Sequence, residues 1–112
     1  MSGITTHVLD LGLGRPAAGV AVTLDVEEAA SGWSELARAR TDDDGRVGDF
    51  GVTLPGPGVY RLVFATGAYH EQTGRASFHP RVEITFRVDD PGEHHHVPLL
   101  LSPFGYSTYR GS

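Results

Sequence analysis

The heptapeptide VEITFRV, residues 82–88, alternates apolar and polar side chains along its whole length. In an extended chain, Val82, Ile84 and Val88 would lie on one side and the polar residues between them on the other. Residues 20–26, VAVTLDV, alternate in the same way. Both segments therefore predict β-strands with one buried face, the unit from which layered β-proteins are built.

Further segments complete the predicted sheets, and turn residues separate them. We expect strands over residues 4–9, 33–40, 46–52 and 59–66, and two closing strands on either side of a turn at 102–105. Loops are indicated by glycine and proline at 12–19 and 55–58, and by an acidic turn at 42–45 whose Gly45 is free to adopt positive φ. Because residues 59–66 (VYRLVFAT) are mostly β-branched or aromatic, that strand should be covered on both faces.

One short helix is predicted over residues 68–73, AYHEQT, with Gly74 as its C-terminal cap. Seven or eight short strands with one helical turn predict an all-β sandwich. The 112 residues have room for one domain, and we expect residues 1–112 to form it. A domain of this size buries a modest core, so assembly into an oligomer would help to stabilise it.

The composition excludes several classes of function. The 9 basic residues are all arginine, the formal net charge is −5 and no basic run exists, so nucleic acid is not an expected partner. Cysteine is absent, which excludes disulfides and thiolate chemistry. No apolar run approaches the roughly 18 residues that span a bilayer, and no signal-peptide pattern precedes the first strand. We therefore expect a cytoplasmic protein that has no membrane partner.

Three adjacent histidines stand at the start of an apolar segment near the C-terminus. On a strand, His94 and His96 would share one face, and His95 would point to the other. Neutral imidazoles suit proton transfer near neutral pH. Two of them on one face, together with His7, would also suit zinc. A solvated cluster without a function is compatible with the same pattern, so the residues alone leave all three interpretations open.

Two further residues have both a structural and a functional interpretation. His7 lies inside the first predicted strand, where a lone histidine is more often structural. Arg46 follows the acidic turn at 42–45 and could form a surface ion pair with it, which would contribute little to stability. Alternatively, its guanidinium could bind a urea-like carbonyl or a developing oxyanion.

The last seven residues, YSTYRGS, are polar and aromatic. Chain ends usually fray, yet Tyr106, Thr108 and Arg110 alternate with the residues between them as a strand would. Tyrosines at such a position favour burial against another surface, for example a neighbouring subunit. A frayed end and a packed end are therefore the two alternatives for this segment.

Residues 94–112, HHHVPLLLSPFGYSTYRGS, closely resemble the end of the 5-hydroxyisourate hydrolases of the transthyretin-like family. The final Tyr-Arg-Gly-Ser is the most diagnostic part of the resemblance. The opening ITTHVLD (4–10) with GRPA (14–17), the Asp-Gly-Arg turn (44–46) and Thr-Gly-Ala-Tyr (66–69) are also similar to that family. His95 and Phe104 depart from its pattern, because tyrosine is common at both places. Residue 95 should face away from the site, so this departure does not affect the resemblance.

This resemblance implies a transthyretin-like β-sandwich of two four-stranded sheets with one short helix, assembled into a homotetramer whose active sites lie between dimers. It implies catalytic roles for His7, Arg46, His96 and Ser112, and substrate contacts from Tyr109, Thr108 and Arg46. The implied reaction is the hydrolytic opening of the 5-hydroxyisourate lactam in purine breakdown, which yields 2-oxo-4-hydroxy-4-carboxy-5-ureidoimidazoline. No cofactor and no metal are expected.

In the expected mechanism, His7 and His96 position and deprotonate a water molecule, and Arg46 binds the substrate's carbonyl oxygens. Ser112 would orient a histidine or the arginine. Which group is the base stays open. The main alternative is a carrier that binds a small ligand in the same channel without catalysis. Tyr109 and Arg110 would narrow and charge such a channel, which favours the hydrolase.

Overall fold

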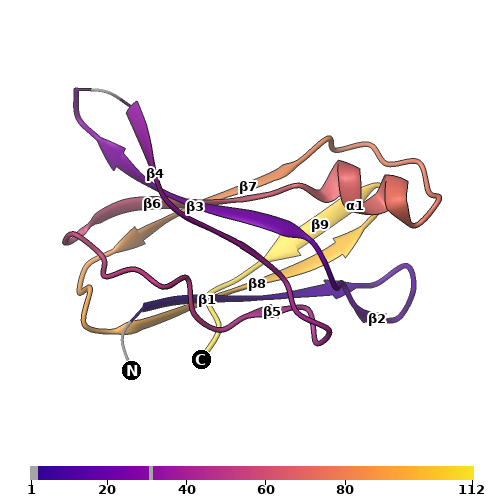
Figure 1. Cartoon of the computed structure of the whole chain (residues 1–112), viewed down its shortest axis with the longest axis horizontal. Coiled ribbons are helices and arrows are strands. Elements are labelled where there is room, and N and C mark those ends of the chain that lie inside the picture. Colours follow the sequence, from indigo (N-terminus) through magenta and orange to yellow (C-terminus); the bar gives the residue numbers. More distant parts are fainter. Residues whose placement is uncertain (1–2, 31) are drawn as a thin grey trace.

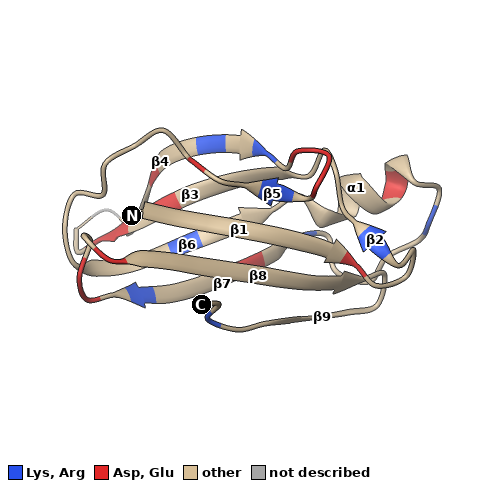
Figure 2. Ribbon diagram, turned by 90° about the horizontal axis from the view of Figure 1, so that it is seen from below, with Lys and Arg blue, Asp and Glu red and all other residues tan. Residues whose placement is uncertain are grey.

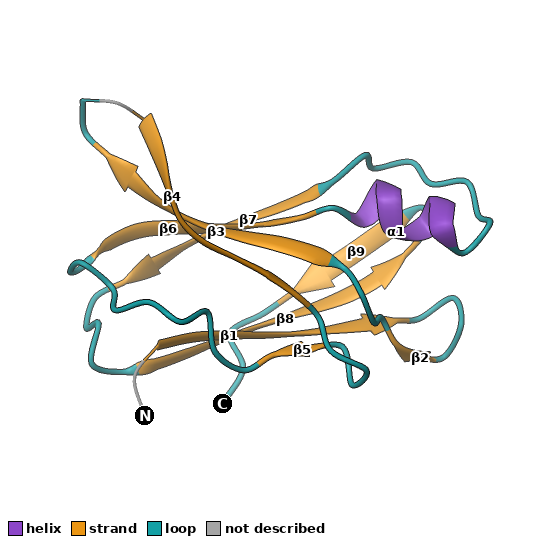
Figure 3. Ribbon diagram, viewed as in Figure 1, coloured by secondary structure: helices purple, strands orange, loops and turns teal. Residues whose placement is uncertain are grey.

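A computed structural model of the chain describes residues 3–30 and 32–112. Its elements, shown in Figure 3, are β1 (Gly3–Asp10), β2 (Arg15–Pro16), β3 (Ala21–Glu28), β4 (Gly32–Arg40), β5 (Arg46–Val47), β6 (Gly58–Phe64), α1 (Thr66–Gln72), β7 (Val82–Val88), β8 (His94–Ser102) and β9 (Gly105–Thr108). The chain is thus almost entirely β, as predicted. The helix α1 is too short to cross a membrane, and no other helix in the described ranges could do so.

The strands form two sheets that lie one above the other in Figure 1. The lower sheet has the order β2-β1-β8-β9, with β5 paired to β1, and the upper sheet has the order β4-β3-β6-β7. Within these ranges β1 and β8 are parallel, and the other strand pairs are antiparallel. The predicted sandwich of two sheets with one short helix is confirmed. The lower sheet has five strands because the short β5 joins it.

Alternating residues of both sheets fill the space between the layers. The core includes Ile4, Val8, Val22, Leu24, Tyr60, Leu62, Phe64, Val82, Ile84, Val88, Val97, Leu99 and Leu101. The alternation predicted for 82–88 is confirmed, since Val82, Ile84 and Val88 are buried. Residue 86 of the same strand is partly buried, and its ring stacks on Tyr60 with 6.4 Å between centroids. The apolar pattern of residues 20–26 and 82–88 therefore places the buried faces of β3 and β7 correctly.

The strand predicted over 59–66 ends at Phe64 instead, because Thr66 begins the helix. The helix was predicted over 68–73 and starts two residues earlier. Gly67 explains this entry: its N–H donates to the carbonyl of Pro80, and a Cβ at residue 67 would lie 2.5 Å from that oxygen. This approach of two distant segments leaves room only for glycine. At the other end, Gly74 follows the helix with φ 72°, as expected of a C-terminal cap.

The strand predicted over 46–52 was also too long, since only Arg46 and Val47 pair with β1. An aspartate turn ends the pairing. The Asp49 carboxylate accepts a hydrogen bond of 2.7 Å from the Gly51 N–H, and Gly51 has φ 73°. Side-chain bonding of this kind competes with the strand ladder and favours a turn.

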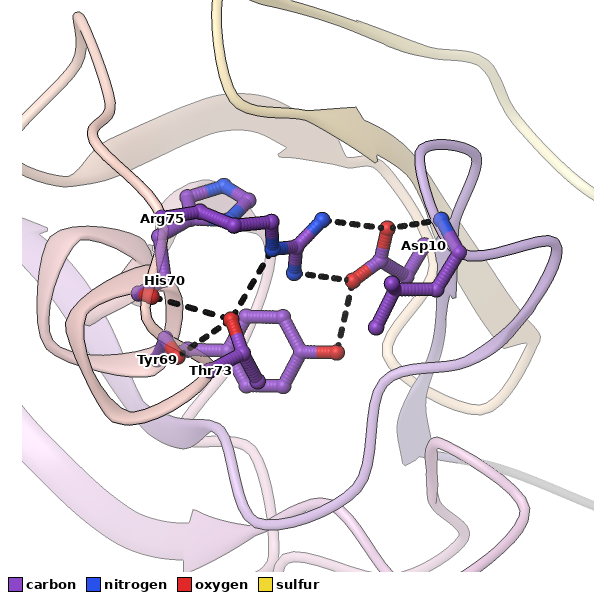
Figure 4. A network of polar contacts seen from close by, with 6 residues as sticks. Asp10, Tyr69, His70, Thr73 and Arg75 are labelled. Carbon is purple, nitrogen blue, oxygen red and sulfur yellow. Dashed lines mark hydrogen bonds and ion pairs between the residues drawn. The ribbon is translucent and has the colours of Figure 1, made fainter.

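A buried carboxylate fastens the helical end of the sandwich to β1 (Figure 4). Asp10, whose side chain is fully buried, receives hydrogen bonds from Arg75 (2.6 and 3.2 Å), from the Tyr69 hydroxyl (2.7 Å) and from the Leu13 N–H (3.0 Å). The Thr73 hydroxyl accepts a hydrogen bond from Arg75 in turn. These contacts connect the end of β1 to α1 and to the segment that follows it.

These donors decide the charge state of Asp10. Burial by itself would raise its pKa, but the hydrogen bonds from Arg75, Tyr69 and Leu13 outweigh burial and lower the pKa to about 2. Burial and the bond to Asp10 raise the pKa of Tyr69 to about 12, so Tyr69 remains a donor. Asp10 is therefore a carboxylate at any pH at which the protein operates.

The substitution Asp10→Asn should lower the free energy of unfolding by about 3 kcal/mol at neutral pH, because it leaves the partly buried Arg75 without its counter-charge. The folded-state pKa of about 2 lies below the ordinary 3.8, so the contribution is complete above pH ~4 and is lost as the pH falls toward 2. Urea denaturation at several pH values measures both effects.

The control is Arg38→Gln, which breaks an exposed ion pair with Glu35. It should leave the urea midpoint unchanged. An Asp10→Asn variant as stable as the parent, or one with an unchanged pH dependence between 4 and 2, would contradict the role given to this carboxylate.

Candidate active site

The parallel pairing of β1 and β8 gathers polar side chains on the outer face of the lower sheet. Thr5 pairs with His96, and residue 3 pairs with His94. Thr5 therefore lies beside His96 on this face, one position along from His94. Figure 2 shows this face from outside. His94 and His96 are partly buried on it, whereas His95 points into the core and is 5% exposed. The predicted alternation of the three histidines is confirmed.

A single hydroxyl lies between the two outer histidines. The Oγ1 atom of Thr5 is 2.8 Å from Nε2 of His94 and 2.7 Å from Nδ1 of His96. Burial, together with the electrostatic influence of His94, Arg46 and His7, lowers the pKa of His96. Its imidazole is consequently neutral at neutral pH, which is the form that can accept a proton.

The acidic turn places Arg46 next to His7. The Asp42 carboxylate accepts hydrogen bonds of 2.9 Å from the N–H groups of Asp44 and Arg46. Gly45 closes the turn with φ 75°, as predicted, and packs so tightly on β1 that a Cβ would lie 2.4 Å from the carbonyl oxygen of residue 8. Arg46 thereby pairs with His7 across β1 and β5. The turn holds the guanidinium at the edge of this face.

In the described part of the chain, Arg46 does not form the surface ion pair with the acidic turn that one interpretation predicted. Among the ion pairs formed by the described residues, none includes Arg46. The nearby Asp42 carboxylate is bound to the backbone of its own turn. Arg46 is exposed on the outer face and is available to a ligand there.

His7 has a structural contact of the kind that one of its two interpretations predicted. Its Nε2–H donates a hydrogen bond of 2.9 Å to the carbonyl oxygen of Asp44, so the ring helps to hold the acidic turn. That bond leaves Nδ1 as the nitrogen with a lone pair when the ring is neutral. The side chain is partly exposed on the same face as Thr5, two residues away on β1.

The C-terminal segment is packed against β8. The Gly111 N–H donates a hydrogen bond of 2.9 Å to the carbonyl oxygen of His96, and Arg110 forms an ion pair with Glu93. A Cβ on Gly111 would lie 2.5 Å from Cδ2 of the His96 ring. The backbone of residue 111 therefore lies directly against this imidazole.

This packing forms a hollow of about 250 Å³ whose lining includes Arg46, His96 and Ser112. Thr5, Thr6, Gly48 and His94 complete it. Three of the four predicted catalytic residues thus lie around one hollow. His7 does not line it but lies beside Arg46 at its edge. A guanidinium, a neutral imidazole and a terminal serine together offer an oxyanion partner, a base and a polar anchor.

The predicted substrate contacts Thr108 and Tyr109 lie in a second hollow, of about 200 Å³. His96 borders both hollows. The Thr108 hydroxyl donates a hydrogen bond of 2.7 Å to the carbonyl oxygen of Pro98, which leaves it as an acceptor for any ligand. Tyr109 is 59% exposed. Within one chain, the predicted site is therefore divided between two adjacent hollows.

For the zinc alternative, the described residues offer no site with three ligands. In the described part of the chain, no group of three or more His, Cys, Asp or Glu side chains could hold a metal ion. The geometry explains this for His94 and His96, because each directs one ring nitrogen at Thr5. The point on which those two nitrogens converge is occupied by the Thr5 hydroxyl, which is the hydrogen-bond partner of both.

Thr5 was not among the site residues predicted from the sequence. It lies two residues before His7, so alternation alone would have placed both on one face. Its importance, however, comes from the neighbouring strand, and the pairing of residue 5 with residue 96 follows from no local pattern.

Comparison with known proteins gives a consistent result. Residues 4–111 match the model of the HIUase/Transthyretin family. The chain is 43% identical over 110 residues to the 5-hydroxyisourate hydrolase of Salmonella typhimurium, a match that covers 97% of this chain and 80% of that one.

Solved structures agree with this match. The 5-hydroxyisourate hydrolase of Klebsiella pneumoniae has a TM-score of 0.85 at 39% identity, covering 97% of this chain and 98% of that one. Sea bream transthyretin, solved in complex with thyroxine, has a TM-score of 0.90 at 34% identity, covering 96% and 93%. A hydrolase and a ligand-binding protein therefore share this fold.

The substitution Gly111→Ala should displace the C-terminal segment, because the added Cβ meets a ring that Thr5 holds in place. The lost hydrogen bond to His96, worth about 1 kcal/mol, should speed amide exchange at residue 111 about fivefold. Hydrogen exchange of the C-terminal peptide, followed by mass spectrometry, measures this.

Gly105→Ala is the matched control, since a Cβ there lies 4.0 Å from its nearest neighbour, the Ser102 hydroxyl. It should leave exchange at residue 111 unchanged. Equal protection of residue 111 in the Gly111→Ala variant and the parent would show that the segment is not packed on His96.

Proposed function

This chain belongs to the HIUase/Transthyretin family, and from that membership we propose that it is a 5-hydroxyisourate hydrolase with its active site at the hollow between Arg46, His96 and Ser112. The observation that carries the proposal is the convergence of these three residues from distant parts of the chain on one hollow. His7 belongs to the same site at its edge.

The substrate is a strained cyclic amide, and the reaction adds water across its lactam bond between N1 and C6. His96 is the base that removes a proton from the attacking water, since its lowered pKa keeps it neutral at neutral pH. His7 presents Nδ1 from the edge of the hollow and positions the water or the substrate.

Arg46 supplies charge where the reaction develops it. Its guanidinium has no ionic partner among the described ion pairs, so it is free to bind the substrate's carbonyl oxygens and the oxyanion that forms at C6. Ser112, through its hydroxyl, orients the guanidinium or an imidazole in the same hollow. The product is 2-oxo-4-hydroxy-4-carboxy-5-ureidoimidazoline. Each step uses side chains and water, so the mechanism needs neither a cofactor nor a metal.

A carrier of a small ligand is the alternative function, and one observation favours it. Sea bream transthyretin, whose structure contains thyroxine, matches this fold closely. The fold therefore does not separate the two functions, whereas the hollow with its base and guanidinium favours hydrolysis. Saturable thyroxine binding without any acceleration of substrate decay would establish the carrier.

We also propose that residues 1–112 form one domain of a homotetramer, in which the outer faces of the lower sheets meet and complete the substrate channel. Large apolar side chains are exposed in the described structure, including Leu11, Phe104, Tyr106 and Tyr109. Burial in an interface would stabilise them. Tyr109 and Thr108 would then contribute to the substrate channel. The cytoplasmic location remains a prediction from the sequence, and cell fractionation tests it.

Light scattering after size-exclusion chromatography should give a mass close to four times the 12.0 kDa of the chain. Replacing Phe104 with Ser should weaken the assembly if its exposed ring is buried between subunits. A monomeric mass for the unmodified protein at micromolar concentration would contradict the tetramer.

The function itself is tested by the ultraviolet decay of freshly prepared 5-hydroxyisourate. The protein should accelerate this decay, and treatment with a chelator should leave the acceleration intact. His96→Ala should reduce kcat/KM by at least about a hundredfold, because general-base catalysis contributes factors of about 10²–10⁴.

Arg38→Gln, on the outer edge of the other sheet, is the control and should retain the parental rate. Decay at the rate seen in buffer alone would refute the hydrolase. Full activity of His96→Ala would remove His96 from the mechanism and leave His7 as the base.

A further inference from the structure

We propose that Thr5 is a positioning residue of the active site: its hydroxyl fixes His96 in the tautomer whose Nε2 lone pair is free, and it connects that ring to His94, which receives the proton. The inference rests on the proposed function. It is carried by the location of one hydroxyl between two imidazoles, 2.8 Å from His94 and 2.7 Å from His96.

The hydroxyl of Thr5 has one hydrogen to donate and two lone pairs that can accept, so three arrangements of neutral rings satisfy both contacts. In the first, Thr5 donates to Nε2 of His94 and accepts from Nδ1–H of His96. In the second, Thr5 donates to Nδ1 of His96 and accepts from Nε2–H of His94. In the third, its oxygen accepts from both rings.

His96 is a base toward the hollow only when its proton is on Nδ1, as in the first and third arrangements. Its lone pair is then on Nε2, and that atom has no hydrogen-bond partner among the described residues. Nε2 is also accessible, since it is not among the buried side-chain atoms that lack a partner. In the second arrangement Nε2 carries the proton and could only donate. General-base catalysis by His96 therefore requires Thr5 to accept from Nδ1–H of His96, and of the two arrangements that allow this only the first lets Thr5 also donate to His94.

The same contact gives the abstracted proton a path. When Nε2 of His96 takes a proton from water, the ring becomes an imidazolium with Nδ1–H directed at Thr5. The N–H bond at Nδ1 can then break as an O–H bond forms on Thr5, while the original O–H bond of Thr5 breaks and an N–H bond forms on Nε2 of His94. His96 ends neutral with its proton on Nε2, His94 ends as the cation, and the charge balances.

The position of His94 suits the end of such a path. It is the first residue of β8 and is partly exposed, next to the turn that precedes the strand. The two imidazole rings lie with their centroids 6.2 Å apart, too far for a direct hydrogen bond, so the hydroxyl between them is the connection. Solvent at this position stabilises the cation on His94 until the C6–N1 bond breaks. N1 then takes the proton from Nε2 of His96, while His94 returns a proton to Thr5 and Thr5 returns one to Nδ1 of His96.

The inference gives two testable consequences, of which the first needs no substrate. In protein labelled with ¹⁵N-histidine, at a pH where His96 is neutral, the ¹⁵N shifts of His96 should show its proton on Nδ1. In Thr5→Val, which keeps the shape and loses the hydroxyl, the shifts should move toward a mixture of tautomers. A proton found on Nε2 of His96 in the parental protein would overturn the inference.

The second consequence is kinetic. Thr5→Val should lower kcat about tenfold or more, because a base in the wrong tautomer forfeits part of its contribution. KM should change little, since Thr5 acts through His96. Thr5→Ser keeps the hydroxyl and should restore most of the rate and the parental shifts. Thr23→Val is the matched control, because Thr23 lies on β3 in the other sheet and should leave kcat unchanged.

The outcomes separate this inference from the proposed function. A parental protein that fails to accelerate the decay refutes the hydrolase, and the catalytic role of Thr5 with it. An active parental protein whose Thr5→Val variant keeps its kcat refutes the role of Thr5 alone. A loss that Thr5→Ser shares, with the thermal midpoint lowered in both variants, would show that Thr5 is structural only.

Discussion

The parallel pairing of β1 with β8 is the constraint on which the rest of the structure depends. It joins the first and the last long strands of the chain, and it places Val8 beside Leu99 on the buried face and Thr5 beside His96 on the outer face. A shift of one residue would exchange the two faces of a strand and put polar side chains into the core. The apolar core therefore fixes the register, and the site obtains its geometry from that register.

The two ends of β1 have different tasks. At its C-terminal end, the buried carboxylate of Asp10 collects donors from Arg75 and Tyr69 and connects the strand to the helix. Toward its N-terminal end, Thr5 and His7 face outward: Thr5 lines the hollow and contacts both imidazoles, and His7 binds the acidic turn at the edge of the hollow. Such separation is physically favourable, because a rigid anchor at one end lets the other end present partly buried polar groups without loss of register.

Much of the fold was predictable from alternation, whereas contacts between distant segments were not. The strand over 82–88 and the opposite faces of His94 and His95 follow from a period of two. The end of β6 and the early start of α1 do not, because Gly67 meets Pro80 through a contact that no local pattern contains. For the same reason, motifs pointed to the histidines, but only the strand pairing brings Thr5 between them.

Charge, more than shape, gives this fold its proposed chemistry. A carboxylate beside His96 would raise its pKa and leave it protonated near neutral pH. What acts on it instead is burial and the electrostatic influence of His94, Arg46 and His7, and each of these lowers that pKa. Arg46 can therefore serve twice, since the charge that keeps the base neutral also stabilises the oxyanion that the base helps to form. A ligand carrier with the same strands would need neither a neutral base nor a partner for an oxyanion. The side chains on the outer face of β1 and β8 therefore distinguish a hydrolase from a carrier.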